Sequence, residues 1–216
     1  MKFISKLKKR WESANSLLCV GLDPQIERVP EVLRSKHSPY FEFCKEVVDA
    51  THEFVCAFKP QAAYFSAVGA ENELEELITY IKRVYPEIPV ILDAKRGDIG
   101  STAALYAQEA YQRYGADAVT VNPYLGFESI EPYMNYSDKG IVVLCRTSNP
   151  GSDWLQKDET DSIPVYQRVA QQVAEWNKSE QFVLVTGATY PEELGRVRQI
   201  VGDMPLLVPG IGAQGG

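Results

Sequence analysis

Charged residues of both signs stand near the ends of apolar runs, and their types could do proton chemistry. Asp93 and Lys95 are two positions apart, and residues two apart in a strand point to the same side. Asp23 and Lys59 end two other apolar runs and could reach the same space, with Asp98 nearby. A lysine fixed beside carboxylates can stabilise a carbanion and then supply a proton to it. The charge pattern alone fits a structural ion-pair network equally well.

Short apolar runs alternate along the chain with segments of helical periodicity, which predicts βαβ units and a parallel sheet. No GxGxxG follows the first run, and polar clusters follow nearly every run, so a TIM (β/α)8 barrel is favoured over a doubly wound sheet. The predicted strands are residues 17–23, 55–61, 90–96, 118–123, 141–147, 182–188 and 206–211. The predicted helices are residues 1–11, 40–54, 72–84, 101–114, 163–176 and 191–201.

The number of predicted strands is one short of a complete barrel. The chain has 216 residues, below the roughly 250 typical of this fold. Either the count misses one strand, or the barrel lacks its last unit. We expect a single barrel domain over residues 1–216 that is incomplete at its C-terminus, with the eighth strand and helix missing.

The last residues, 209–216, read Pro-Gly-Ile-Gly-Ala-Gln-Gly-Gly and include Gly212 and Gln214. Glycines leave backbone N–H groups unobstructed, and such a nest attracts an anion without net positive charge. Loops after the seventh and eighth strands of these barrels commonly bind phosphate. The segment could equally be a simple turn.

Composition and charge limit the partners. The formal net charge is −7, so the summed field opposes binding to nucleic acid or to an anionic membrane. No apolar stretch approaches the 18 residues that a membrane span needs, and charged residues interrupt the N-terminal segment. The spacing of Cys19, Cys44, Cys56 and Cys145 predicts no metal site. We expect a cytoplasmic protein.

Residues 93–102, Asp-Ala-Lys-Arg-Gly-Asp-Ile-Gly-Ser-Thr, resemble the D-x-K-x-x-D-I-x-x-T signature of orotidine 5′-phosphate decarboxylases at all five fixed positions. The resemblance extends along the chain, to residues 19–24, 58–61, 147–151 and 209–216. The sequences of residues 93–98 and of residues 147–150 are similar to those of the bacterial type 2 branch.

This resemblance implies loss of CO2 from C6 of orotidine 5′-phosphate to give uridine 5′-phosphate, the last step of de novo pyrimidine synthesis, without a metal or organic cofactor. Lys95 then resembles the lysine that protonates C6, and Asp93 the aspartate near the departing carboxylate. The implied roles of the others are ribose contact for Asp23 and Lys59, pyrimidine contact for Ser148, and phosphate-loop contact for Gln214 and Gly212. Asp98 and Thr102 resemble residues that reach a partner subunit's site, which implies a homodimer.

Two alternatives stay open. Phosphosugar lyases of the same superfamily, decarboxylases or aldolases, share the Asp-x-Lys-x-x-Asp core but use Mg2+, bound partly by an acid near the end of strand two, where this chain has Lys59. A non-catalytic nucleotide-binding fragment is the other, because family members continue into an eighth strand and a phosphate-binding arginine after the glycine-rich loop.

Overall fold

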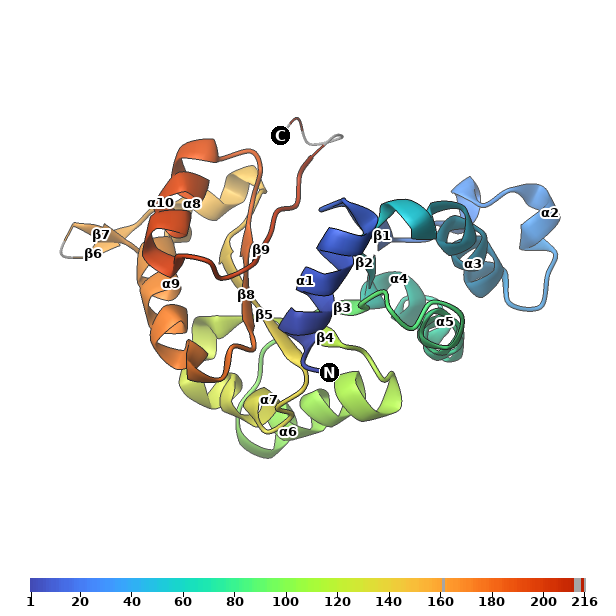
Figure 1. Cartoon of the computed structure of the whole chain (residues 1–216), viewed down its shortest axis with the longest axis horizontal. Coiled ribbons are helices and arrows are strands. Elements are labelled where there is room, and N and C mark those ends of the chain that lie inside the picture. The colour runs from blue at the N-terminus through green and yellow to red at the C-terminus, as the bar shows by residue number, and fades with distance from the viewer. Residues whose placement is uncertain (161, 212–214, 216) are drawn as a thin grey trace.

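Parallel strands form the centre of the molecule, as the computed structural model shows for residues 1–160, 162–211 and 215 (Figure 1). All seven predicted strands are confirmed, most of them shorter than predicted. They are β1 (Cys19–Leu22), β2 (Ala57–Pro60), β3 (Ile91–Arg96), β4 (Ala118–Val121), β5 (Gly140–Arg146), β8 (Phe182–Thr186) and β9 (Leu206–Leu207).

The strands neighbour one another in the order of the chain, as in a (β/α) barrel. β1 pairs with β2, and β3, β4, β5, β8 and β9 follow in one sheet, every pair being parallel. Isolated bridges from Phe58 to Val90 and from Gln61 to Asp93 join β2 to β3. Because all these strands run in the same direction, their carboxyl ends meet at one face.

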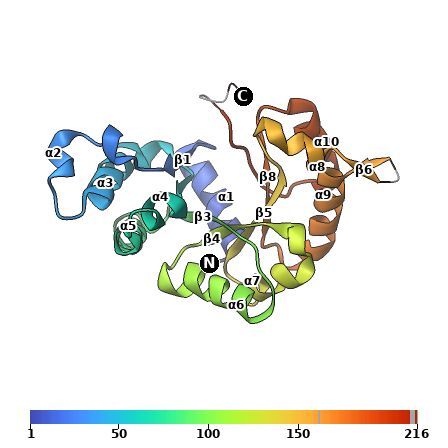
Figure 2. The ribbon, with the colours of Figure 1, turned by 180° about the vertical axis from the view of Figure 1, so that it is seen from behind.

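Helices cover the outside of the strands, as the two opposite views show (Figure 2). The long helices lie where the periodicity predicted them: α3 (Pro39–Thr51), α5 (Glu71–Val84), α6 (Gly100–Gln108), α9 (Val165–Trp176) and α10 (Pro191–Val201). A π-helical turn, Glu109–Arg113, continues α6. The predicted start of α9 at residue 163 is wrong, because Ile163–Pro164 is a short strand, β7, that pairs with β6 (Glu159–Thr160).

Several short elements were not predicted. The short α-helices are α2 (Glu31–Arg34), α4 (Ala62–Ser66), α7 (Glu131–Met134) and α8 (Asp153–Gln156). Single 3-10 turns lie at Ile26–Arg28, Pro123–Leu125, Phe127–Ser129, Pro150–Ser152 and Asn177–Ser179. Another, His52–Phe54, falls within the predicted helix of residues 40–54. One turn of helix is too short to show a hydrophobic period, so the sequence carries little signal for these elements.

The first helix, α1 (Phe3–Ala14), packs against the strands and belongs to the core. Phe3 and Leu7 are buried against a cluster that includes Ala57, Ile91 and Val142. Arg10 donates hydrogen bonds from its guanidinium to the backbone oxygens of His52 and Val55. The predicted amphipathic helix is therefore confirmed. Among the described residues, no helix is long and apolar enough to cross a membrane.

Gly140, the first residue of β5, gives a test of this packing. A Cβ placed there would lie 2.1 Å from Cδ1 of Phe3, so Gly140→Ala forces the ring or the helix to move. We expect the free energy of unfolding to fall by about 1–3 kcal/mol in a denaturant titration. Gly195→Ala is the matched control: nothing lies within 4 Å of its Cβ, and α10 should be unaffected or slightly stabilised. Equal losses at the two sites would contradict this role of Phe3.

Candidate active site

The carboxylate of Asp93, in β3, is the centre of a charge cluster at the carboxyl ends of the strands. Asp93 is only 6% exposed. Lys59 Nζ donates to its Oδ2 over 2.9 Å, and Lys95 Nζ donates to its Oδ1 over 2.7 Å. Burial alone would raise the pKa of Asp93, but the nearby charges and hydrogen bonds of Lys59 and Lys95 outweigh it and the pKa is lowered. Asp93 is therefore a carboxylate at neutral pH.

Lys95 reaches Asp93 through an unusual backbone. Regular strand alternation predicted that the side chains of Asp93 and Lys95 share a side of the strand. The two side chains do meet, but the backbone between them is not that of a regular strand. Lys95 has φ +46°, and the pairing of β3 with β4 shifts register between Leu92 and Arg96. A non-glycine residue in this left-handed region costs about 1–3 kcal/mol and persists only where its surroundings hold it, often at functional sites. The Lys95 side chain is 48% exposed, so its ammonium is open to a ligand.

Thr120, in β4, holds this backbone and was not predicted as a site residue. Its Oγ1 accepts hydrogen bonds from the N–H groups of Ala94 and Lys95, each over 2.9 Å. It also donates to Asp93 Oδ1 over 2.8 Å. Thr120 is 1% exposed. The only sequence signal is a polar residue within an apolar strand, which carries little weight without the pairing partner.

Lys59, in β2, is the second cation of the cluster. Its side chain is 17% exposed. Burial lowers the pKa of Lys59, but the charge of Asp93 and the hydrogen bond to Asp93 raise it by more, and Asp23 adds a smaller effect. The net result is a raised pKa. The ammonium is therefore charged when buried. Lys59 donates a hydrogen bond to Asp93. Among the described contacts none joins Lys59 to Asp23, so Asp23 acts on Lys59 only through its charge. Lost hydration raises the pKa of Asp23, although the charge of Lys59 opposes this.

Asp98 and Thr102 follow β3 and do not join the cluster around Asp93. Asp98 Oδ1 accepts a hydrogen bond from the N–H of Ile99, and Thr102 is exposed in the first turn of α6. Arg96 pairs with Glu109 over 2.8 Å and packs on the ring of Tyr106. The signature is therefore divided in space. Asp93 and Lys95 contribute to the cluster, whereas Asp98 and Thr102 lie outside it.

Ser148 lies in the segment after β5, close to the segment after β8. A Cβ on Gly187 would lie 2.7 Å from the Cα of Ser148, so only glycine permits this approach. The hydroxyl of Thr189 donates to the backbone oxygen of Ser148 over 3.1 Å. Gly212 and Gln214 lie outside the described residues.

Comparison with known proteins shows the family to which the chain belongs. A family model described as "Orotidine 5′-phosphate decarboxylase / HUMPS family" matches residues 16–216. The orotidine 5′-phosphate decarboxylase of Ralstonia pickettii (strain 12J) is 59% identical over 217 residues, which cover 100% of this chain and 80% of that protein. The chain belongs to the orotidine 5′-phosphate decarboxylase family. The predicted family is thus confirmed.

Solved structures confirm the barrel fold. The chain superposes on the orotidine 5′-phosphate (OMP) decarboxylase of Leishmania donovani with a TM-score of 0.86 and 41% identity, covering 98% of this chain and 80% of that one. The UMP synthase of Leishmania donovani gives a TM-score of 0.89 and 44% identity over 100% of this chain, which spans only 46% of that longer protein. These neighbours and the bacterial relatives agree with the type 2 branch.

Thr120→Val tests the support beneath Lys95. The change keeps the shape of the side chain but leaves two backbone N–H groups without an acceptor, so we expect a loss of about 1–3 kcal/mol in the free energy of unfolding. Thr186→Val in β8 is the matched control, because the buried Thr186 hydroxyl has no partner among the described residues. That variant should be neutral or slightly more stable. If both variants lose the same stability, the hydrogen bonds of Thr120 do not hold the turn.

Proposed function

We propose that Lys95, Asp93, Lys59 and Asp98 perform the decarboxylation of orotidine 5′-phosphate, the activity of the family to which the chain belongs. The observation that carries this assignment is the half-exposed ammonium of Lys95, held 2.7 Å from the buried carboxylate of Asp93. The reaction gives uridine 5′-phosphate and CO2, and in this proposal the side chains act without a metal or organic cofactor. We also propose that it takes place in the cytoplasm as the last step of de novo pyrimidine synthesis.

The chemical difficulty lies at C6 of the pyrimidine. When the bond from C6 to the carboxylate carbon breaks, CO2 leaves and the electron pair stays on C6, in the plane of the ring. The ring π system does not delocalise that pair, so stabilisation must come from charge already in position. Lys95 supplies a fixed ammonium for this purpose. Its Nζ–H bond then breaks, a C6–H bond forms, and solvent returns a proton to the amine.

Asp93 and Lys59 prepare that ammonium before the substrate arrives. Asp93 orients Lys95, and Lys59 balances the second oxygen of the same carboxylate. In the proposed complex Asp93 lies beside the departing carboxylate, while Asp23 and Lys59 contact the ribose hydroxyls. Ser148 contacts the pyrimidine, and the glycine-rich sequence that includes Gly212 and Gln214 contacts the phosphate. Binding energy from these remote parts is then available to the reacting ring.

A homodimer is proposed from the surface around Asp98 and Thr102. Two large apolar side chains that neighbour these residues along the chain are exposed: Ile99 by 52% and Leu105 by 64%. An exposed apolar patch is typical of protein interfaces, and these two side chains would contribute to one. A second copy of the chain would cover it and bring Asp98 and Thr102 to the partner's Lys95 cluster. Each active site would then contain residues from both subunits.

A magnesium-dependent phosphosugar lyase is the second candidate, because the family model's description covers more than decarboxylases. Lys59 argues against it, since its ammonium lies 2.9 Å from Asp93 and would repel a divalent cation there. Removal of divalent metal with EDTA separates the two: decarboxylation of orotidine 5′-phosphate should continue, whereas a magnesium lyase would stop.

Lys95→Ala should abolish turnover of orotidine 5′-phosphate. Loss of the positioned acid should lower kcat by at least about 100-fold, the lower range for general acid catalysis. The fold should persist because the side chain is half exposed, and circular dichroism and thermal unfolding would check this. Lys36→Ala, at an exposed lysine outside the cluster, is the control and should retain activity. Near wild-type kcat in Lys95→Ala would remove the role proposed for Lys95.

Mixing two inactive variants tests the shared site. Lys95→Ala and Asp98→Ala should each be inactive alone. In a hybrid dimer both defects fall in one site and the other site is intact, so mixed subunits should regain up to about a quarter of wild-type activity. Lys95→Ala mixed with Asp93→Ala is the matched control: these residues serve the same site from one subunit, so no activity should return. Failure of the first mixture to recover, with hybrids present by mass spectrometry, would exclude the shared site.

A further inference from the structure

Arg146, the last residue of β5, is a buried cation outside the cluster around Asp93. Its side chain is 0% exposed. Its guanidinium lies 2.6 Å from Asp153 Oδ1 and 3.8 Å from Glu193 Oε1, so two carboxylates balance the charge. Burying a cation is expensive unless it is paired and hydrogen-bonded, and a hydrophobic residue would fill the same space without that cost. The position of the guanidinium therefore calls for a reason beyond packing.

The contacts of Arg146 organise the segment that carries Ser148. Nη1 donates to Ser152 Oγ and to Gln156 Oε1, and Nη2 donates to Asp153. Gln156 in turn accepts from the N–H of Thr147 over 2.9 Å and donates to its hydroxyl over 2.9 Å. Arg146 thus ties the far end of residues 147–156 back to the start, and this closed segment contains Ser148.

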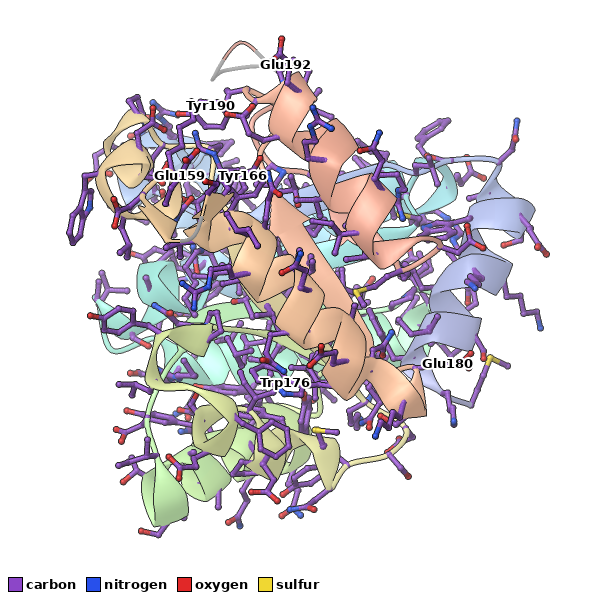
Figure 3. All side chains as sticks on the ribbon, turned by 90° about the vertical axis from the view of Figure 1, so that its left-hand side faces the viewer. Glu159, Tyr166, Trp176, Glu180, Tyr190 and Glu192 are labelled. Atoms are coloured by element: carbon purple, nitrogen blue, oxygen red, sulfur yellow. The ribbon has the colours of Figure 1, made fainter. Side chains whose placement is uncertain are left out.

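The same guanidinium also joins this segment to the one that follows β8. Its Cζ lies 3.6 Å from the ring centroid of Tyr190. Tyr190 stands immediately before α10, where Figure 3 labels it. The backbone oxygen of Arg146 accepts from the N–H of Gly187 over 2.7 Å. Lys157 adds an ion pair of 3.1 Å with Glu193, the acid that also faces Arg146. Arg146 is therefore placed between two segments at the carboxyl ends of the strands.

We propose that Arg146 is a positioning residue for the reaction, which fixes residues 147–156 so that Ser148 meets the pyrimidine ring. The inference rests on the proposed contact between Ser148 and the pyrimidine. Arginine suits the task because its planar fork donates in several directions at once while one face stacks on Tyr190; lysine has a single ammonium and no flat face. Arg146 acts on the base-binding part of the site and not on the part that holds the sugar phosphate.

Because of this division, a ligand with the base and a ligand without it should respond differently to changes at Arg146. A merely structural role would affect the binding of both ligands. Uridine 5′-phosphate carries the base, whereas ribose 5-phosphate lacks it, and calorimetry can measure the Kd of each for the full chain. Arg146→Lys and Asp153→Asn should both weaken binding of uridine 5′-phosphate by about threefold to tenfold, the range of one or two lost hydrogen bonds, and leave ribose 5-phosphate unchanged. Asp153 is half exposed, so its variant should fold even if Arg146→Lys does not.

Matched controls lie close by. Asp158→Asn removes a carboxylate just after α8, and Arg196→Lys changes an exposed arginine of α10; neither residue belongs to the contacts described. Both controls should bind the two ligands as the unchanged chain does. In addition, Ser148→Ala should weaken the binding of uridine 5′-phosphate. Its effect should not add to that of Asp153→Asn, because Asp153 acts on the ligand through Ser148.

The outcomes separate this inference from the proposed function. Weakening by Ser148→Ala without weakening by Asp153→Asn or Arg146→Lys would overturn the role of Arg146 and leave the Ser148 contact standing. Equal weakening of both ligands would also overturn it, since Arg146 would then support the fold as a whole. Selective loss of uridine 5′-phosphate in Asp153→Asn, absent from Asp158→Asn, supports it.

Discussion

The buried carboxylate of Asp93 is the constraint to which the site conforms. A charge that is 6% exposed is tolerated only when it is paired, because an unpaired buried ion costs several kcal/mol, as an order of magnitude. Lys59, Lys95 and Thr120 together supply three hydrogen bonds to its two oxygens. Each comes from a different position, on β2, β3 and β4, so the requirement of one side chain fixes three adjacent strands relative to one another.

This arrangement also explains the strained backbone at Lys95. A regular strand would continue in register with β4, but here β3 carries extra residues and Lys95 turns to φ +46°. The two N–H groups exposed by the turn are both taken up by Thr120. The cost of the turn is offset within the folded protein, before any ligand binds. An ammonium placed in this way needs little reorganisation when negative charge develops beside it, which is where electrostatic catalysis gains most.

The sequence predicts the parts of the structure that repeat and misses those that depend on register. Strands and long helices have periods of two and 3.6 residues over enough length to be read, and α5 begins one residue before its predicted start. The hairpin of β6 and β7 and the one-turn helices have no such length. Asp93, Lys95 and Lys59 could be predicted to meet because the ends of parallel strands share one face. Thr120 could not, because its role depends on which residue of β4 faces the turn after Asp93.

Asp93 and Arg146 show two uses of a buried charge at the end of a strand. Asp93 keeps one partner, Lys95, 48% exposed, so its network is open to a ligand. Arg146 is closed on all sides by its own loop, by Tyr190 and by two acids, so its network can hold backbone but cannot itself react. β4 stands between their strands. The reacting group and the loop proposed to orient the base thus belong to two networks that share no residue among the contacts described.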